Sequence, residues 1–256
     1  MFKKYWKFFV IFWSVVLVGI IGVFVFFWLI SAGKLGFMPT FEELENPNNR
    51  FASEVYFADG PIMNRYFEKE NRKYIEYREI PQSVIDALIA TEDVRFYDHS
   101  GVDVRGLFRV AKGLLTANTS AGGGSTISQQ LAKMLFPRES DLNVFELAIR
   151  KFREWVIAVR LEKSYTKEEI LTMYLNKYDF LNLAVGISSA ADIYFQVPLD
   201  SLKVEQAAML IGMAKNSSYY NPVRRPELTL NRRNVVLSQM YKYDKITREE
   251  CDSLKK

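Results

Sequence analysis

The feature that most constrains this chain is a run of 23 residues without a charged side chain, Phe8 to Ile30. About 20 apolar residues in a helix span the hydrocarbon core of a bilayer. The alternative is a cleaved signal peptide, whose apolar core has only about 7–15 residues. Because Lys3, Lys4 and Lys7 precede the run, we expect a transmembrane helix with a cytoplasmic N-terminus and everything beyond residue 31 outside.

The rest of the composition describes a folded domain without a nucleic-acid signal. The chain has 256 residues, 49% of them hydrophobic, which is enough for one domain with a sizeable core. A net charge of +4, without a basic stripe interleaved with aromatic residues, does not indicate nucleic-acid binding. The single cysteine, Cys251, cannot form an internal disulfide, and no cysteine–histidine cluster has zinc-site spacing.

Local patterns divide the chain into segments and predict a mainly α fold with a small N-terminal β element. The predicted segments are a tail (1–7), a transmembrane helix (8–30), a linker (31–50), a β-hairpin region (51–80) and a mainly helical domain (81–256). The dipeptide Asp59-Gly60 is a turn signal inside the hairpin region. A third β-favouring stretch follows at Tyr74–Tyr77.

Helical periodicity runs through the domain after Pro81. The expected helices run from Pro81 to about Glu92 and over 103–117, 125–136, 142–163, 166–176, 202–213 and 229–241. Capping boxes at Thr166 and Thr247 mark two helix starts. The apolar stretch 190–198 is predicted to lie either in the core or on a membrane-facing surface.

The block 90–101 contains an adjacent acid pair, an aromatic pair and the only histidine of the chain. Glu92 falls at the end of an apolar helix, where partial desolvation suits a carboxylate to proton transfer; an ordinary helix-end carboxylate is the alternative. Asp93 is expected to cap the helix or orient Glu92. Phe96 and His99, taken alone, are typical of core positions.

Two further polar blocks suggest a phosphate site. Residues 122–133 place glycines, hydroxyls, amides and Lys133 at a helix start, which suits a pyrophosphate, although a mobile loop with a hydroxyl cap has the same composition. Arg150, Lys151 and Glu154 share one helix face. That face is either a solvated salt-bridge surface or, because the helix is apolar almost all round, the lining of a cleft.

In this order the blocks resemble the motifs of the peptidoglycan glycosyltransferases, family 51, the transglycosylase module of class A penicillin-binding proteins. The matching residues are Glu92-Asp93, Phe96, His99 and Gly101 for the first motif, 123–127 with Gln129-Gln130 for the second and Arg150-Lys151 with Glu154 for the third. The fourth is matched by Lys167, Ile170-Leu171 and Tyr174-Leu175-Asn176, and the fifth by Arg232-Arg233, Val236-Leu237 and Met240.

The resemblance implies a lysozyme-like glycosyltransferase domain that polymerises lipid II into β-1,4-linked glycan strands and releases undecaprenyl pyrophosphate. Glu92 would be the general base, and Lys133, Arg150 and Lys151 would neutralise the pyrophosphate. Glu154 would organise these cations or hold a divalent metal, Mg or Mn, and no other cofactor is implied. The implied substrate-binding residues are Asp93, Phe96, His99, Ser125, Thr126, Gln129, Gln130, Lys133, Arg150, Lys151 and Asn176.

The chain departs from the family pattern at three places. Thr172 stands where the family usually has glutamate, and Gln196 stands where glycine is common. The connection from Lys133 to Arg150 is longer than usual, and Arg138 is the nearest match for a family arginine there.

The combined Ser-x-x-Lys, Ser-x-Asn and Lys-Thr-Gly set of a transpeptidase is not found. The hairpin region 51–80 and the segment after Met240 nevertheless look like those of class A enzymes. We therefore expect a truncated bifunctional protein, with a naturally monofunctional enzyme as the alternative. Two other functions stay open, a catalytically silent scaffold for wall synthesis and a lytic glycosidase. The expected partners are lipid II, the nascent glycan strand, the bilayer and other wall-synthesis proteins, and no nucleic acid.

Overall fold

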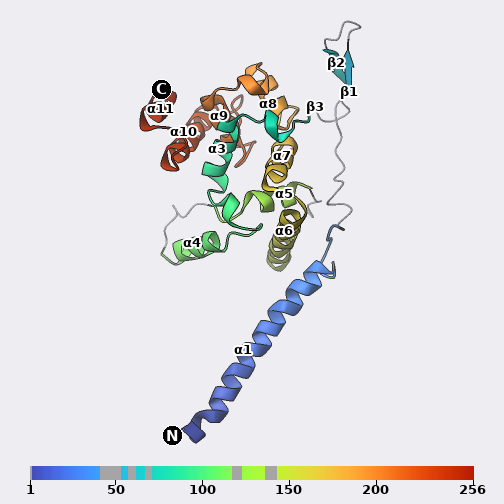
Figure 1. Cartoon of the computed structure of the whole chain (residues 1–256), viewed down its shortest axis with the longest axis vertical. Coiled ribbons are helices and arrows are strands. Elements are labelled where there is room, and N and C mark those ends of the chain that lie inside the picture. The colour runs from blue at the N-terminus through green and yellow to red at the C-terminus, as the bar shows by residue number, and fades with distance from the viewer. Residues whose placement is uncertain (1, 41–52, 57–61, 67–70, 117–122, 136–142) are drawn as a thin grey trace.

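The computed structural model describes residues 2–40, 53–56, 62–66, 71–116, 123–135 and 143–256. It consists of a helical body from which one long helix, α1 (Phe2–Ser31), extends away (Figure 1). The helices of the body are α3 (Gln82–Glu92), α4 (Val104–Leu115), α5 (Ile127–Leu135), α6 (Val144–Ser164), α7 (Lys167–Lys177), α8 (Ile187–Phe195), α9 (Val204–Met213), α10 (Pro226–Lys242) and α11 (Arg248–Leu254). The prediction of a mainly α fold is confirmed.

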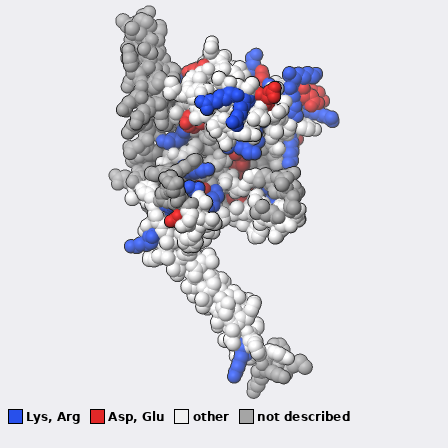
Figure 2. Space-filling view, turned by 180° about the vertical axis from the view of Figure 1, so that it is seen from behind, with Lys and Arg blue, Asp and Glu red and all other residues white. Residues whose placement is uncertain are grey.

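Helix α1 is long and apolar enough to cross a membrane. Its apolar part, Tyr5–Ser31, has 27 residues, which corresponds to about 40 Å of helix. Figure 2 shows charged side chains over the helical body, whereas α1 is uncharged along most of its length. The helix begins before the predicted residue 8 because the lysines in the N-terminal segment are good helix formers.

The C-terminal end of α1 packs on α6. Phe26 and Phe27 each contact the ring of Phe152 edge-on, with ring centroids 5.4 and 5.7 Å apart. Arg160 of α6 donates from Nη2 to the main-chain oxygen of Ser31 at 2.8 Å. It also donates from Nη1 to the carbonyl of Pro39 at 3.0 Å, and burial lowers its pKa. The membrane-type helix is therefore joined to the body by both apolar and polar contacts.

The β element is small and follows the prediction only in part. Strands β1 (Ser53–Tyr56) and β2 (Ile62–Tyr66) pair antiparallel, as a hairpin requires, while the predicted turn at Asp59-Gly60 lies outside the described residues. The stretch Tyr74–Tyr77 is not a strand. Instead β3 (Asn71–Arg72) pairs in parallel with β4 (Ala184–Val185), a contact between distant parts of the chain that local patterns do not reveal.

The helices of the body form two packed groups. Helix α3 packs against α9 and α10, and α5 packs against α6 and α7. Val84 and Leu88 of α3 and Leu131 of α5 are fully buried in one continuous core. The first two blocks identified from the sequence lie where α3 ends and α5 begins, so they fall at the junction of the two groups, and the third lies within α6.

Helix ends follow local chemistry. Thr166 accepts a hydrogen bond from the main chain of Glu169, and Thr247 accepts one from Glu250, so both predicted capping boxes are confirmed. Helix α10 begins at Pro226, three residues before the predicted start, because proline suits the first position of a helix.

Helix α8 was not predicted, and it contains most of the stretch 190–198, for which core and membrane-facing positions were both open. Ala190 and Ala191 are fully buried, so this part belongs to the core rather than to a membrane-facing surface. The helix ends at Gln196, whose φ of 56° is left-handed. Glycine adopts that conformation most easily, so Gln196 holds a conformation that most side chains disfavour.

Gly101 is the tightest main-chain contact between the block 90–101 and α6. Its φ is +94°, and a Cβ placed there would lie 2.7–2.8 Å from the main chain at Ala158 and Val159. Real Cβ atoms do not approach main-chain atoms so closely, and β-carbons also disfavour this φ. Only glycine lets the loop after η2 (Phe96–Asp98) lie against α6.

We predict that Gly101→Ala destabilises the folded body by at least about 2 kcal/mol, through left-handed strain and overpacking. For a chain of this size that corresponds to a fall in Tm of roughly 4–8 °C, measurable by circular dichroism in detergent. Gly123→Ala is the matched control, because a Cβ at Gly123 meets nothing within 4 Å. Equal melting of the two variants would contradict the prediction.

Candidate active site

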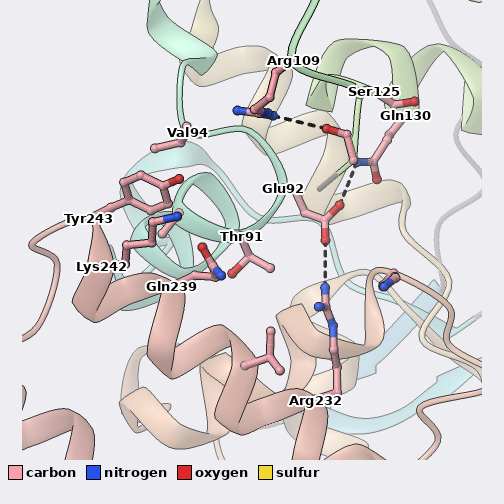
Figure 3. A pocket seen from close by; sticks show the side chains of 15 residues that line it. Thr91, Glu92, Val94, Arg109, Ser125, Gln130, Arg232, Gln239, Lys242 and Tyr243 are labelled. Carbon is pink, nitrogen blue, oxygen red and sulfur yellow. Dashed lines mark hydrogen bonds and ion pairs between the residues drawn. The ribbon is translucent and has the colours of Figure 1, made fainter. Parts of the chain in front are cut away.

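A pocket with a cavity volume of about 410 Å³ opens beside the end of α3 (Figure 3). Glu92, Ser125 and Gln130 line it, and Figure 3 shows the side chain of Glu92 between Gln130 and Arg232. The cationic residues of the lining are Arg109, Lys215, Arg232 and Lys242. Among the described lining residues Glu92 is the sole carboxylate, so the pocket has a strong excess of positive charge.

The two oxygens of Glu92 have different donors. Gln130 donates from Nε2 to Oε2 at 3.0 Å, and Arg232 donates from Nη2 to Oε1 at 3.3 Å. The Glu92 side chain is 14% exposed and the Arg232 side chain 11%. The carboxylate is thus held by one neutral and one charged donor while part of it still faces the pocket.

Residues beneath the pocket fix the two donors. Tyr174 of α7 donates from its hydroxyl to Oε1 of Gln130 at 3.0 Å. Arg232 donates from Nε to the carbonyl of Gly212 at 3.4 Å and lies over the ring of Tyr220. Each donor to Glu92 therefore has a second contact that limits its rotation.

Asp93 joins the loop after α3 to the start of α5. Its carboxylate accepts from His99 Nε2 at 3.0 Å and from the main-chain N–H of Ile127 at 3.0 Å. The N–H of Gly101 donates to His99 Nδ1 at 3.2 Å, which assigns the ring proton to Nε2. Because Ile127 opens α5, this carboxylate determines where that helix begins relative to Glu92.

The carbonyl of Gly101 receives a second set of bonds. Thr126 donates from Oγ1 at 2.7 Å and Gln129 donates from Nε2 at 3.3 Å. Lys167 donates to the carbonyl of His99 at 2.7 Å and lies 4.3 Å from the centroid of the Phe96 ring. The first, second and fourth motifs are thus joined mainly through buried contacts.

Several of the predicted substrate-binding residues do not line the pocket, and their substrate contacts stay a prediction. Phe96, His99, Gln129 and Asn176 lie outside the pocket lining. Phe96 is in the core, and His99, Gln129 and Asn176 each bond to protein groups, although Oε1 of Gln129 has no partner among the described residues. Asn176 holds the main chain of Ile75 by accepting at 3.0 Å and donating at 2.9 Å. Asp93 and Thr126 line a small hollow that adjoins the pocket at Glu92.

The cations of α6 reach the pocket through Ser125. Lys151 donates from Nζ to Ser125 Oγ at 3.0 Å and to Glu154 at 2.9 Å. Arg150 is half-buried and Lys133 is exposed, and neither lines the pocket. Arg138 lies outside the described residues. Of the three cations expected at a pyrophosphate, Lys151 contacts the lining residue Ser125.

The sequence of this chain matches a known protein family. A family model described as "Transglycosylase" matches residues 59–241, which is most of the chain. The chain belongs to the transglycosylase family. This membership confirms the resemblance drawn from the ordered motifs, all of which fall inside the matched residues.

Curated relatives of this transglycosylase include two proteins named penicillin-binding protein 1A. That of Escherichia coli (strain K12) is 37% identical over 84% of this chain and 25% of its own length. That of Pseudomonas aeruginosa is 38% identical over 80% of this chain and 24% of its own length. The chain thus spans about a quarter of the length of these relatives.

A solved structure also matches. The crystal structure of penicillin-binding protein 1A from Haemophilus influenzae aligns with a TM-score of 0.45 and 23% identity. The match covers 82% of this chain and 21% of that one.

Four cations of the transglycosylase pocket were not among the predicted site residues. Arg232 belongs to the fifth motif, but its contact with Glu92 does not follow from the sequence pattern. Arg109, Lys215 and Lys242 carry no local signal, since single basic residues are ordinary on exposed surfaces. Their shared pocket becomes visible only after α4, α9 and α10 are assembled.

The described residues contain no group of three His, Cys, Asp or Glu side chains that could hold a metal ion. Glu154 offers a single carboxylate, and Lys151 already donates to it. Magnesium is often held by one or two carboxylates together with phosphate oxygens of a substrate. Glu154 fits that arrangement as one ligand, with the rest coming from a phosphorylated substrate and water.

Proposed function

We propose that this chain polymerises lipid II into β-1,4-linked glycan strands and releases undecaprenyl pyrophosphate. The observation that carries the proposal is a single carboxylate, Glu92, in a pocket whose other charged lining residues are cations. A reaction between two lipid pyrophosphates needs one base and several positive charges. Membership in the transglycosylase family supports the same reaction class.

Glu92 is assigned the role of general base. It removes the proton from the 4-hydroxyl of the acceptor's N-acetylglucosamine, and that oxygen attacks C1 of the donor's N-acetylmuramic acid. The bond from C1 to the pyrophosphate oxygen breaks, and inversion at C1 gives the β-1,4 linkage. Gln130 and Arg232 support this role because they hold both carboxylate oxygens in place before the substrate arrives.

Lys133, Arg150 and Lys151 are assigned to the leaving pyrophosphate, whose negative charge grows as the bond breaks. Lys151 has the strongest support, since it contacts Ser125 at the pocket edge. Glu154 is assigned the orientation of Lys151, to which it is bound at 2.9 Å. A Mg or Mn ion bound at Glu154 would add charge to neutralise the pyrophosphate, and the assignments above do not depend on it.

Two rival functions have weaker support. A glycosidase usually places two carboxyl groups on either side of the scissile bond. Among the described lining residues this pocket has one, beside cations that a hydrolase does not need. A silent scaffold has no use for a carboxylate held by two donors. Incubation of the detergent-solubilised protein with labelled lipid II separates the three, since polymer, cleaved glycan and unchanged substrate differ on a gel.

The bilayer is the proposed location of the reaction, with α1 as anchor and the body on the outer side. Exposed apolar side chains on α4 and α6 support this, among them Phe108, Leu115, Val144 and Phe145. In Figure 1, α4 and α6 occupy the edge of the body from which α1 leaves. Apolar side chains on that edge suit contact with lipid, so the pocket would meet lipid-linked substrate near the headgroups. Other wall-synthesis proteins are proposed partners.

We predict that Glu92→Gln abolishes polymerisation without loss of the fold. Removal of a general base costs about 10²–10⁴-fold in rate. The rate is measured with labelled lipid II in detergent, and folding by the Tm. Asp98→Asn is the matched control, because Asp98 lies in the same motif, is exposed and does not line the pocket. A folded Glu92→Gln variant with near-wild-type turnover would remove Glu92 from the mechanism.

We predict that Lys133→Ala and Arg150→Ala each lower kcat/KM for lipid II by about 10- to 150-fold, since a charge-assisted contact is worth roughly 1.5–3 kcal/mol. Steady-state kinetics on labelled lipid II measure the effect. Lys163→Ala is the control, because Lys163 is exposed and lies at the C-terminal end of α6, outside the third motif. Unchanged kcat and KM in both test variants would show that these residues are only surface charges.

We predict that deletion of residues 1–31 slows the reaction on bilayer substrate more than on detergent micelles, because the anchor supplies effective concentration rather than chemistry. The ratio of the two rates is the measurement. Since Ser31 also bonds to Arg160, the Tm of the shortened protein is recorded alongside. An equal slowing in both media would contradict the anchor role.

The topology has its own test in intact spheroplasts. Added protease is expected to digest the region beyond residue 31 and to spare the N-terminal tail. Protection of the body with cleavage of the tail would invert the orientation and contradict an outward-facing transglycosylase.

A further inference from the structure

Tyr174 lies one layer below the pocket and reaches Glu92 through Gln130. Its side chain is 1% exposed, and its hydroxyl donates to Gln130 Oε1 at 3.0 Å. The amide nitrogen on the other side of Gln130 donates to Glu92 Oε2 at 3.0 Å. Figure 3 shows the second of these bonds at the pocket surface. Two hydrogen bonds thus run in series from the core to the carboxylate.

The direction of this series depends on the tyrosine hydroxyl. An amide group has nearly the same shape in its two orientations, so its partners decide which end faces which way. With the nitrogen toward the Glu92 carboxylate, the amide oxygen needs a donor on its far side. Burial raises the pKa of Tyr174 well above its usual value, and the nearby Glu92 charge raises it further. The hydroxyl therefore keeps its proton and remains a donor.

Packing alone does not account for the hydroxyl. The Tyr174 ring stacks on Tyr178 with centroids 5.8 Å apart, and a phenylalanine ring would occupy the same space. Within the described part of the chain, the hydroxyl bonds to Gln130 and to no other group. A buried hydroxyl is unfavourable unless it is hydrogen-bonded, so its presence is explained by the amide that it holds.

We propose that Tyr174 is a positioning residue of the active site, whose hydroxyl holds the Gln130 amide in the orientation that directs Glu92 toward the acceptor hydroxyl. The inference rests on the proposed function, since it assumes that Glu92 accepts a proton. The frame is rigid enough for the role. Helices α5 and α7 pack on each other, and Leu131 and Leu175, which directly follow Gln130 and Tyr174, are fully buried.

The first experiment is a double-mutant cycle on the full chain with labelled lipid II. Tyr174→Phe is expected to lower kcat by about 3- to 10-fold, the cost of one lost hydrogen bond, and to leave KM unchanged. Gln130→Ala lowers kcat further. If Tyr174 acts through Gln130, the double variant is no slower than Gln130→Ala alone. Losses that multiply in the double variant would overturn the proposal.

Tyr194→Phe is the matched control. Its hydroxyl donates to the carbonyl of Phe180 at 2.6 Å, away from the pocket lining. This variant is expected to keep the wild-type kcat even where its Tm falls. A Tyr174→Phe variant that loses Tm but keeps kcat would show that Tyr174 is purely structural and would overturn the proposal.

A spectroscopic readout separates this inference from the proposed function. In protein labelled with ¹⁵N-glutamine, the side-chain amide signal of Gln130 is identified by its loss in Gln130→Ala. It is expected to shift or broaden in Tyr174→Phe and not in Tyr194→Phe. That result stands even if wild-type protein fails to polymerise lipid II, which would refute the function alone. An unmoved Gln130 signal in Tyr174→Phe overturns the positioning role.

Discussion

The buried carboxylate of Asp93 is the interaction on which the candidate site depends. It accepts one bond from His99 in its own loop and one from Ile127, which is 34 residues further along the chain. Hydrogen bonds to a charged group contribute about 1.5–3 kcal/mol, more than a neutral pair. Glu92 directly precedes Asp93, and Gln130 is one helical turn beyond Ile127. The bond that joins the two segments therefore also brings Glu92 and its amide donor together.

That junction explains why the pocket lies between the two helix groups. One group supplies Glu92 from α3 and Arg232 from α10, and the other supplies Gln130 from α5 and Lys151 from α6. Neither group carries both the Glu92 carboxylate and the Lys151 ammonium. Charge of opposite sign is thus brought together by tertiary packing, while each helix still buries an ordinary apolar face.

Local physics made some elements predictable and left others hidden. Glu92 at the end of α3 and the capping box at Thr166 follow from patterns within a few residues. The contact of Arg232 with Glu92 joins residues 140 apart, which no local pattern contains. Helix α8 was missed because it contains small buried residues such as Ser188 and Ala190. Such residues do not form an apolar stripe along one face of a helix, so the sequence carries no helical pattern there. The bonds of Asn176 to the main chain of Ile75 depend on side-chain direction, which spacing along the chain does not encode.

The packing of α1 on α6 divides this helix into two parts that differ in how freely their amino-acid sequence can vary. Along Tyr5–Ser31 no residue of the most apolar window is buried in the isolated chain, and any uncharged helix of similar length would serve there. The last turns differ, since Ile30 is fully buried and Phe26, Phe27 and Ser31 contact α6. A membrane helix borrowed from another protein would substitute for α1 only if these C-terminal residues were transplanted back onto it.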